Sequence, residues 1–364
     1  MIIKELTDFL ESHAPKALQE SYDNAGLITG NAADEIQGVL ISLDVTEAVI
    51  EEAVEKDANL IVAHHPIIFK GLKRLTGDDY VQRCIIKAVK NNIALYAAHT
   101  NIDNVLGGVN SKIAELTGLK NTDILSPQKG RLRKLVTFVP GAQLEEVREA
   151  LFAAGAGHIG NYDKCSYNLE GSGTFRAGEN THPFVGKQGE LHTEPEVRTE
   201  TIYPDYHEAS VIRALHKAHP YEEPAYDIYA LENEHKQIGA GIIGDLSYEE
   251  PALDFLKKIK KIFGTDCIRH TKLNGRNIKK VAFCGGSGSF LLSAAKARKA
   301  DIFISADFKY HEFFDAEDDI IIADIGHYES EQYTKNLFYE LITKNFSNFA
   351  CSISAINTNP INYL

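Results

Sequence analysis

The chain is short of cysteine, of positive charge and of long apolar runs, and each shortage excludes a class of protein. Its 5 cysteines are widely separated and form no CxxC pair, which argues against a disulfide framework and a thiolate zinc site. Lys and Arg number 38 against 51 Asp and Glu, so the formal net charge of −13 disfavours nucleic acid as a partner. No apolar run approaches membrane-spanning length, and charged residues near the N-terminus argue against a signal peptide. We therefore expect a cytoplasmic protein.

The two ends of the chain share one pattern, in which short aliphatic runs alternate with segments of helical periodicity. A length of 364 residues predicts two or three domains. Alternating strands and helices favour right-handed crossovers, and so an α/β domain with a mainly parallel sheet and helices on both faces. The expected strands are 39–43, 60–63, 93–98, 281–284, 302–305 and 320–323, and the expected helices are 2–13, 47–56, 80–90, 290–299 and 331–344.

The middle of the chain has a different order of elements. Strand, helix, a glycine- and tyrosine-rich stretch, strand, helix and strand follow one another, which is typical of the ferredoxin-like βαββαβ plan. We predict that residues 131–231 form an inserted α+β domain, and that 1–130 and 232–364 together form the α/β domain around it. The expected elements are strands at 135–139, near 197–202 and at 225–231, and helices at 144–154 and 208–218.

Polar side chains follow several of the predicted strands at the point where each strand ends. In an open parallel sheet the carboxyl ends of the strands form the edge at which ligands bind. His327 and Glu331 are four residues apart, so a helix beginning there places both on one face. The motifs at this edge are Asp44, His64-His65-Pro66, His99-Thr100-Asn101-Ile102-Asp103 and Gly326-His327-Tyr328-Glu329-Ser330-Glu331.

These motifs together favour a metal site, although each alone is more simply explained by structure. An isolated histidine pair is usually structural, and an isolated HxxxE is usually a hydrogen-bonded pair on a helix. Three imidazoles (His64, His65, His327) and two carboxylates (Asp103, Glu331) exceed the needs of one four-coordinate ion with an open position. Two ions bridged by a carboxylate would use them all. Mixed imidazole and carboxylate ligation suits Zn, Fe, Mn, Ni or Co.

Weaker signals surround this set. The backbone N–H groups of Gly285, Gly286, Ser287 and Gly288 lie between a strand and a helix, where they would suit an anion, and close packing explains the glycines equally well. Asp44 and His311 are candidates for the wall of the same pocket. The segment Tyr221-Glu222-Glu223-Pro224 indicates a loop before the last strand of the insert, and we assign it no chemistry.

With these residues assembled, the chain resembles the GTP cyclohydrolase I type 2 homologue family, also called Nif-three-like or NGG-interacting-factor-like proteins. The motifs above carry the resemblance, together with Tyr22-Asp23-Asn24-Ala25-Gly26-Leu27, where Tyr22 replaces a tryptophan common in relatives. The resemblance implies a dinuclear centre of two divalent metal ions per chain, with Glu331 as the bridge and His99 close by. It also implies a PII-like (CutA-like) insert and a toroidal homohexamer. The ligands it implies are His64, His65, Asp103, His327 and Glu331.

Two functions compete. The first is a metal-dependent hydrolase acting on a nucleotide or phosphoester, in which His99 moves protons and the family name suggests ring-opening hydrolysis of GTP. The second is a non-enzymatic metal-binding regulator or metal-handling protein, in which the PII-like insert senses a small-molecule effector. Whether the protein is an enzyme stays open at this point, as do the native metal, the substrate and the ligand of the insert.

Overall fold

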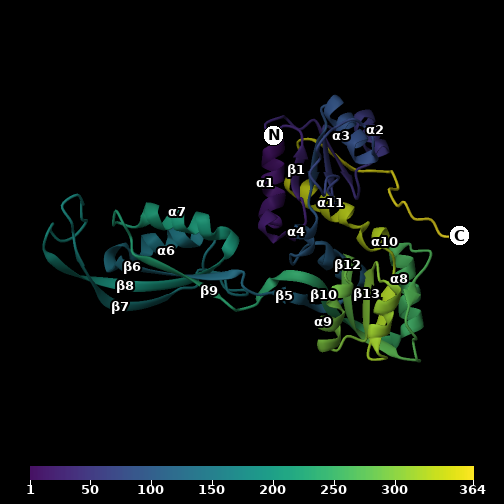
Figure 1. Ribbon diagram of the computed structural model, residues 1–364. Coiled ribbons are helices and arrows are strands. Elements are labelled where there is room, and N and C mark those ends of the chain that lie inside the picture. The colour runs from purple at the N-terminus through teal and green to yellow at the C-terminus, as the bar shows by residue number, and fades with distance from the viewer. The chain divides into compact units, whose positions relative to one another are not determined.

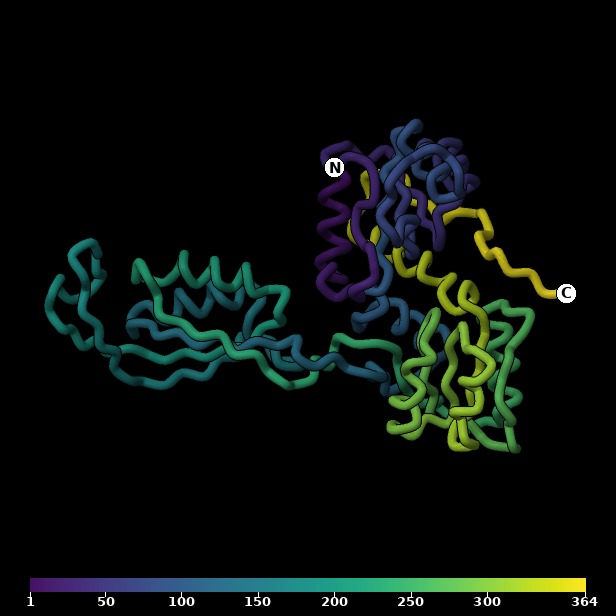
Figure 2. Tube along the Cα trace, in the orientation of Figure 1, coloured from purple at the N-terminus to yellow at the C-terminus, as the bar shows by residue number.

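A computed structural model describes residues 1–364 and divides the chain into two compact units. The outer unit comprises Met1–Pro127 and Gln237–Leu364, and the inserted unit comprises Gln128–Lys236 (Figure 1). Neither unit contains a helix long and apolar enough to cross a membrane. Figure 2 follows the chain from the N-terminal helix to the extended residues 354–364 that follow the last strand.

The first sheet of the outer unit carries the motifs of the N-terminal half. Its strand order is β1-β4-β3-β2-β15, in which β1 is antiparallel to β4 and the remaining neighbours are parallel. One face packs on α2 and α3 because Leu40, Ile61 and Leu95 share a buried core with the apolar sides of those helices. The elements are α1 (Ile3–His13), β1 (Gly26–Thr29), β2 (Gly38–Ser42), α2 (Glu47–Glu55), β3 (Leu60–Ala63), α3 (Tyr80–Lys90), β4 (Ala94–Ala97) and β15 (Ala350–Ile353).

The second sheet of the outer unit has the order β11-β14-β13-β12-β10-β5. Its centre, β12 to β14, is parallel, whereas β10 and β11 are antiparallel to their neighbours. Helix α9 packs on it through Leu292 and Ala295. Its strands are β5 (Lys120–Gln128), β10 (His235–Pro251), β11 (Arg269–His270), β12 (Asn277–Ser287), β13 (Ile302–Ala306) and β14 (Ile321–Asp324).

The expectation of one mainly parallel sheet was therefore wrong in two respects, since the outer unit has two sheets and the second is mixed. The outer-unit strands that the sequence pattern missed were β1, β5, β11 and β15. The glycine-rich segment 239–244 indicates a strand and lies in β10, where glycine marks the close approach of another backbone. Those glycines are required by the approach of β5: a Cβ on Gly239 would lie 2.1 Å from the carbonyl oxygen of Ser126, and one on Gly244 would lie 2.9 Å from that of Lys120. The residue numbers fall along β5 as they rise along β10, so the two strands run antiparallel.

The remaining helices of the outer unit range from 4 to 12 residues in length. They are α4 (Thr100–Asp103), α5 (Val109–Thr117), α8 (Ala252–Phe263), α9 (Leu292–Ala297), α10 (His327–Glu331) and α11 (Thr334–Asn345), with 3-10 turns at Lys16–Leu18, Ser289–Leu291 and Tyr310–Ala316.

The inserted unit is a four-stranded sheet with two helices on one face. Its order is β7-β8-β6-β9 with every neighbouring pair antiparallel, which is the strand order of a ferredoxin-like sheet. Leu135, Val139 and Tyr203 point from the sheet to the helices. The elements are β6 (Leu132–Pro140), α6 (Leu144–Ala153), β7 (Tyr167–Arg176), β8 (Leu191–Pro204), α7 (Glu208–Ala218) and β9 (Tyr226–Leu231), with 3-10 turns at Gly141–Gln143 and Asp205–His207.

Because the two units have separate cores, damage to one core should leave the other intact. Leu151 is 1% exposed in the core of the inserted unit. We expect Leu151→Ala to lower the free energy of unfolding of that unit by about 2–5 kcal/mol, through lost burial and the cavity left behind. Hydrogen exchange should quicken in residues 132–231 and not in 1–127. Leu191→Ala, at a side chain that is 75% exposed, is the matched control and should change little.

Candidate metal centre

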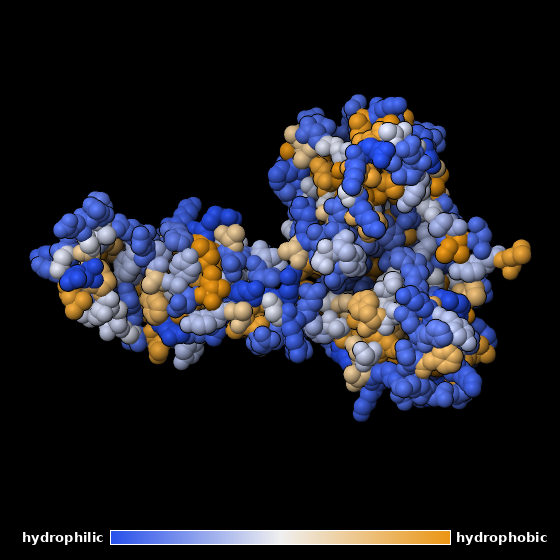
Figure 3. Space-filling model, in the orientation of Figure 1, coloured by the Kyte–Doolittle hydropathy of each residue, from blue (hydrophilic) through white to orange (hydrophobic).

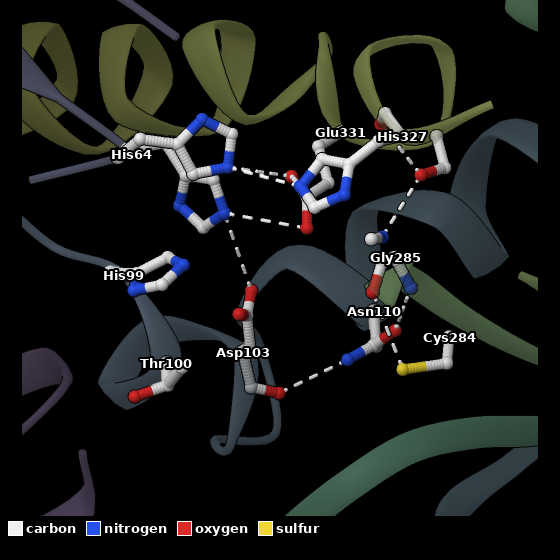
Figure 4. Close-up of polar contacts among 12 residues, drawn as sticks. His64, His99, Thr100, Asp103, Asn110, Cys284, Gly285, His327 and Glu331 are labelled. Atoms are coloured by element: carbon white, nitrogen blue, oxygen red, sulfur yellow. Dashed lines mark hydrogen bonds and ion pairs between the residues drawn. The ribbon is translucent and has the colours of Figure 1, made fainter. Parts of the chain in front are cut away.

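The carboxyl ends of the parallel strands in both sheets of the outer unit lead to one cavity of about 740 Å³. His64 and His65 directly follow β3, and His99 follows β4. His327 and Glu331 lie on α10, three residues after β14 ends. Side chains far apart in the sequence are brought together in this way, and Figure 4 shows them converging. The cavity wall includes His65, His99, Asp103, His327 and Glu331.

His64 is fully buried, and its imidazole is fixed in one tautomer. Its Nδ1–H donates to the carbonyl oxygen of Ala98 at 2.9 Å. The other ring nitrogen, Nε2, has no hydrogen-bond partner and lies 3.7 Å from Oδ1 of Asp103 and 3.6 Å from Oε1 of Glu331. Burial lowers the pKa of His64, so the ring is neutral. A lone pair therefore faces two carboxylates inside the protein, an arrangement that a cation between them would stabilise.

His65 and His327 both face the second oxygen of Glu331. Nε2 of His65 lies 2.9 Å from Oε2 of Glu331, and Nε2 of His327 lies 3.1 Å from the same atom. Although burial opposes the charged imidazole, hydrogen bonds to carboxylates on both sides raise the pKa of His65 to about 9 and that of His327 to about 11. The nearby histidines in turn lower the pKa of Glu331 against the effect of burial.

Asp103 completes the set from α4. Its Oδ1 is buried and has no hydrogen-bond partner. Burial, followed by the negative charge of Glu331, raises the pKa of this carboxyl group. Asn110 connects the backbone of α4 to that of β12. Its Nδ2 donates to the carbonyl oxygen of Asp103, and its Oδ1 accepts from the N–H of Gly285 (Figure 4).

The ligand atoms form overlapping groups. His64, Asp103 and Glu331 have one side-chain nitrogen or oxygen each within 4.8 Å of one another, and the same is true of His65, His327 and Glu331. A third group joins His64, His65 and His99. Two of the three groups share Glu331, so each of them holds imidazole nitrogen and carboxylate oxygen, the atoms that bind first-row divalent metals.

Carboxylates outside the cluster orient three of the four histidines through Nδ1. His65 donates to Asp44 at 2.7 Å, His99 to Asp23 at 2.8 Å and His327 to Asp307 at 2.7 Å. Such an outer carboxylate fixes the ring and leaves Nε2 directed at the ligand site. Burial opposes ionisation of Asp23, but its hydrogen bonds from His99 and Thr100 lower its pKa to about 2, so it carries a negative charge.

Sequence reasoning missed the orienting roles of Asp23 and Asp307. Asp23 lies within the segment Tyr22–Leu27 that resembles the family motif, but nothing in its spacing pairs it with His99 across 76 residues. Asp307 follows β13 at the same sheet edge as the other motifs, and this position was the available signal. Its φ of 59° is uncommon outside glycine and marks a backbone held in place by its surroundings.

Of the two explanations for Gly285–Gly288, an anion site or close packing, the structure favours packing at the first two residues. The N–H of Gly285 donates to Asn110, and that of Gly286 donates to the hydroxyl of Ser330. Packing explains the glycine at 286, since its φ is +61° and a Cβ there would lie 2.2 Å from Oε1 of Glu331. The segment therefore makes room for a carboxylate, and Ser287 does line the cavity.

Of the two residues predicted to line the pocket, Asp44 and His311, only Asp44 does so. Asp44 lines the cavity and holds His65. His311 is exposed in the turn Tyr310–Ala316, where it contacts Tyr310 and Phe314, and it is absent from the cavity wall. That candidate was wrong because the 3-10 turn after β13 directs the side chain away from the sheet edge.

Loss of charge at Asp44 should weaken metal binding without removing a ligand. Asp44→Asn keeps an oxygen that accepts from His65 and an amide group that reaches Thr358, its second partner. We expect divalent-metal affinity to fall about 10–100-fold, as for other outer-shell partners of metal-bound histidine. Competition with a chromophoric chelator measures it. Asp34→Asn, at an exposed carboxylate, should bind metal like the parent, and an equal loss there would contradict the assignment.

Comparison with known proteins identifies the chain over nearly its whole length. The family Duf34/NIF3 (NGG1p interacting factor 3) matches residues 1–360. The chain belongs to the DUF34/NIF3 family. Its curated relatives include the "GTP cyclohydrolase 1 type 2 homolog" of Halalkalibacterium halodurans, 41% identical over 97% of this chain and 96% of that protein. The protein of the same name from Bacillus subtilis (strain 168) is 38% identical, covering 99% of this chain and 98% of its own.

Solved structures place the DUF34/NIF3 chain in the same fold. The Bacillus cereus protein related to NIF3 is 39% identical, superposes with a TM-score of 0.86 and covers 100% of this chain and 99% of its own. The Staphylococcus aureus protein SA1388 is 30% identical with a TM-score of 0.79, over 100% of this chain and 99% of that one. The resemblance noted from the sequence motifs is therefore confirmed at the level of the family.

Proposed function

We propose that the cavity binds two divalent metal ions and that the protein is a metal-dependent hydrolase. The division of the two Glu331 oxygens carries this proposal: Oε1 faces His64, whose Nε2 also faces Asp103, and Oε2 faces His65 and His327. A carboxylate with one oxygen in each of two ligand groups is the arrangement of a bridge. The unpartnered His64 Nε2 and Asp103 Oδ1 are buried polar atoms that a cation would satisfy.

Bound divalent ions would lower the pKa of a coordinated water towards neutrality and stabilise negative charge on oxygen. Within this chain His99 is placed to move a proton, since Asp23 holds its Nδ1 and its ring borders the same cavity. His99 also contacts the rings of His64 and His65, at centroid distances of 5.3 and 5.4 Å. It could therefore take part in ligation, and this alternative has a separate test below.

The cavity wall favours a substrate with a flat ring, because it contains several exposed aromatic side chains. Tyr22, Phe69 and Phe290 line the cavity and are at least half exposed, so their faces are available for stacking on a base. No Lys or Arg lines the wall. We propose a nucleotide or phosphoester as the substrate class, and the name of the curated relatives, "GTP cyclohydrolase 1 type 2 homolog", supports the nucleotide. With no Lys or Arg in the wall, the metal ions would supply the positive charge that its phosphates need.

The test is release of product from GTP and from simple phosphoesters by metal-loaded protein. We expect His99→Gln to keep its metal and lose at least 100-fold in turnover, since general acid–base groups contribute about 10²–10⁴-fold. If His99→Gln loses metal as well, His99 is a ligand. If the metal-loaded parent turns over none of these substrates, hydrolysis of this class is overturned.

The alternative is a metal-binding regulator or metal-handling protein with a sensing insert. The observation that favours it is the inserted unit, whose ferredoxin-like strand order is that of PII-like domains and which contains a cavity of its own. Deletion of 131–231 separates the two functions, because a hydrolase confined to the outer unit keeps its turnover without the insert. A protein that binds metal and never turns over substrate is the regulator.

The assembly and the compartment remain proposals as well. We propose a toroidal homohexamer on the family resemblance alone, and the mass of the protein in solution tests it. We propose the cytoplasm as the compartment, supported by five cysteines that are all free.

A further inference from the structure

The inserted unit has a cavity of about 600 Å³ that neither the metal centre nor the proposed hydrolysis uses. It lies on the face of the sheet opposite the helices, over β7 and β8, and the segments 177–184 and 221–225 close its sides. The long loop between β7 and β8 is drawn in teal at the end of the inserted unit in Figure 1. Its wall contains Tyr221, Glu222 and Glu223, the segment to which the sequence alone assigned no chemistry.

Three aromatic rings border this cavity. The ring centroids of Phe175 and Tyr221 are 6.1 Å apart with an interplanar angle of 57°, and those of Phe184 and Tyr221 are 6.3 Å apart at 47°. The rings are tilted and not stacked on one another, so their faces are left free to border a common space. Phe184 is 53% exposed and offers one of these faces to a ligand. Figure 3 shows apolar residues scattered along the inserted unit among hydrophilic ones.

A buried histidine fixes the position of Tyr221. His219 is 6% exposed, and its Nε2–H donates to the carbonyl oxygen of Phe138 at 2.9 Å. That leaves Nδ1 to accept the backbone N–H of Tyr221 at 3.1 Å. Burial lowers the pKa of His219, which keeps the ring neutral as both contacts require. The tyrosine is thus held at its backbone, and its ring contacts His219 at a centroid distance of 4.9 Å.

A carboxylate is held beside the rings. The Tyr221 hydroxyl donates to Oε1 of Glu196 at 2.8 Å. The other oxygen of Glu196, Oε2, would lie only 2.3 Å from a Cβ added to Gly173. Glycine at this position of the neighbouring strand β7 therefore leaves room for the carboxylate. The wall also contains Glu170, Glu222 and Glu223.

Glu170 and Arg176 alternate along β7 with the cavity-facing Leu169 and Phe175, so their side chains point to the other face of the sheet. Glu222 accepts the backbone N–H of His182, at 3.2 Å. On β8, Glu196 and Arg198 are on the cavity face. Arg198 is already paired with Glu200, at 2.9 Å. The Glu196 carboxylate, held by Tyr221, is therefore the negative group that lies beside the aromatic rings.

We propose that this cavity binds a small organic cation carrying an alkylated ammonium group. Aromatic faces attract such a cation through the negative charge of the ring face, and the alkyl substituents suit an apolar wall. The Glu196 carboxylate supplies the countercharge while Tyr221 holds it in place. The inference is independent of the metal centre, since every residue involved lies in the inserted unit.

The test is calorimetric titration of the full chain with choline and with its uncharged isostere, in which carbon replaces the ammonium nitrogen. We expect choline to bind and the isostere not to. Phe184→Ala, which removes one ring face, should weaken choline binding about 2- to 30-fold. Glu196→Gln should also weaken it, because it removes the charge while keeping an oxygen for Tyr221. Tyr162→Ala, at an aromatic side chain that is 75% exposed and outside the cavity, should bind choline like the parent.

Each other result overturns the proposal. Equal binding of choline and its isostere would show an apolar pocket without preference for charge. Absence of choline binding at about 10 mM, on the order of the weakest affinities that calorimetry resolves, would remove the site. Equal weakening by Tyr162→Ala would place the effect on folding of the unit and not on the cavity. Binding of inorganic phosphate that Arg198→Ala abolishes would assign the cavity to anions.

Discussion

Glu331→Gln is expected to lose both of the divalent ions that we propose, because one carboxylate serves both ligand groups. Its oxygens lie 2.9 Å and 3.1 Å from His65 and His327, and 3.6 Å from His64. The amide of glutamine has one weakly ligating oxygen and an NH₂ group that cannot bind metal. Loss of a single outer-shell partner costs about 10–100-fold in affinity, so loss of this ligand should exceed about 100-fold at each position. Elemental analysis of metal per chain measures the result.

The matched control lies on the same helix. Glu329 is also buried, but its Oε1 accepts from Asn359, away from the histidines, and glutamine can keep that hydrogen bond. Glu329→Gln should therefore retain the metal content of the parent. If Glu331→Gln keeps one ion per chain while Glu329→Gln keeps two, Glu331 binds one ion only and does not bridge. If both variants keep all their metal, the centre lies elsewhere.

Gly286→Ala is expected to abolish metal loading although glycine offers no ligand. The added Cβ would lie 2.2 Å from Oε1 of Glu331 and 3.3 Å from Cε1 of His327, so both side chains would have to move. Because a displacement of about 1 Å is enough to spoil a metal site, we expect a loss close to that of Glu331→Gln. The φ of +61° adds a backbone penalty of about 1 kcal/mol for a residue with a Cβ.

Gly264→Ala isolates that backbone penalty. Gly264 ends α8 with a φ of +62°, and nothing lies within 4 Å of an added Cβ. It should lose about 1 kcal/mol of unfolding free energy and none of its metal. Melting temperature and metal content, measured together on both variants, separate strain from displacement. Equal metal content in the two variants would show that the approach of Gly286 to Glu331 is not required.

Local pattern predicted the strands that carry the site because their aliphatic runs are buried on both faces. The segment 60–63 was expected as a strand and is β3, and 93–98 was expected where β4 occupies Ala94–Ala97. The end of each such strand is where His64 and His99 lie. The parallel register of β2, β3 and β4 then brings their carboxyl ends to one edge, so the sequence was sufficient to gather these histidines.

What the sequence could not supply is the contact between distant segments. The spacing along the chain does not show that Asp23 and Asp307 each hold a histidine, because each pair forms only when two strands of one sheet become neighbours. Asp23 precedes β1 and His99 follows β4, whereas Asp307 follows β13 and His327 follows β14. The division into two sheets was missed for a related reason. The glycines at 239–244 indicate a strand, but nothing in the sequence shows that β5 pairs with it. In the fold these glycines are the points at which β5 lies close to the backbone of β10.

The pairing of β5 with β10 also bears on how this architecture can change over evolutionary time. The chain leaves the outer unit at the end of β5 and re-enters it at the start of β10, and these strands are antiparallel neighbours. The whole inserted unit thus occupies the place of a hairpin turn, a position where chain length varies at little cost to the strands it joins. A lineage could acquire, exchange or discard the unit while every strand of the outer unit kept its register.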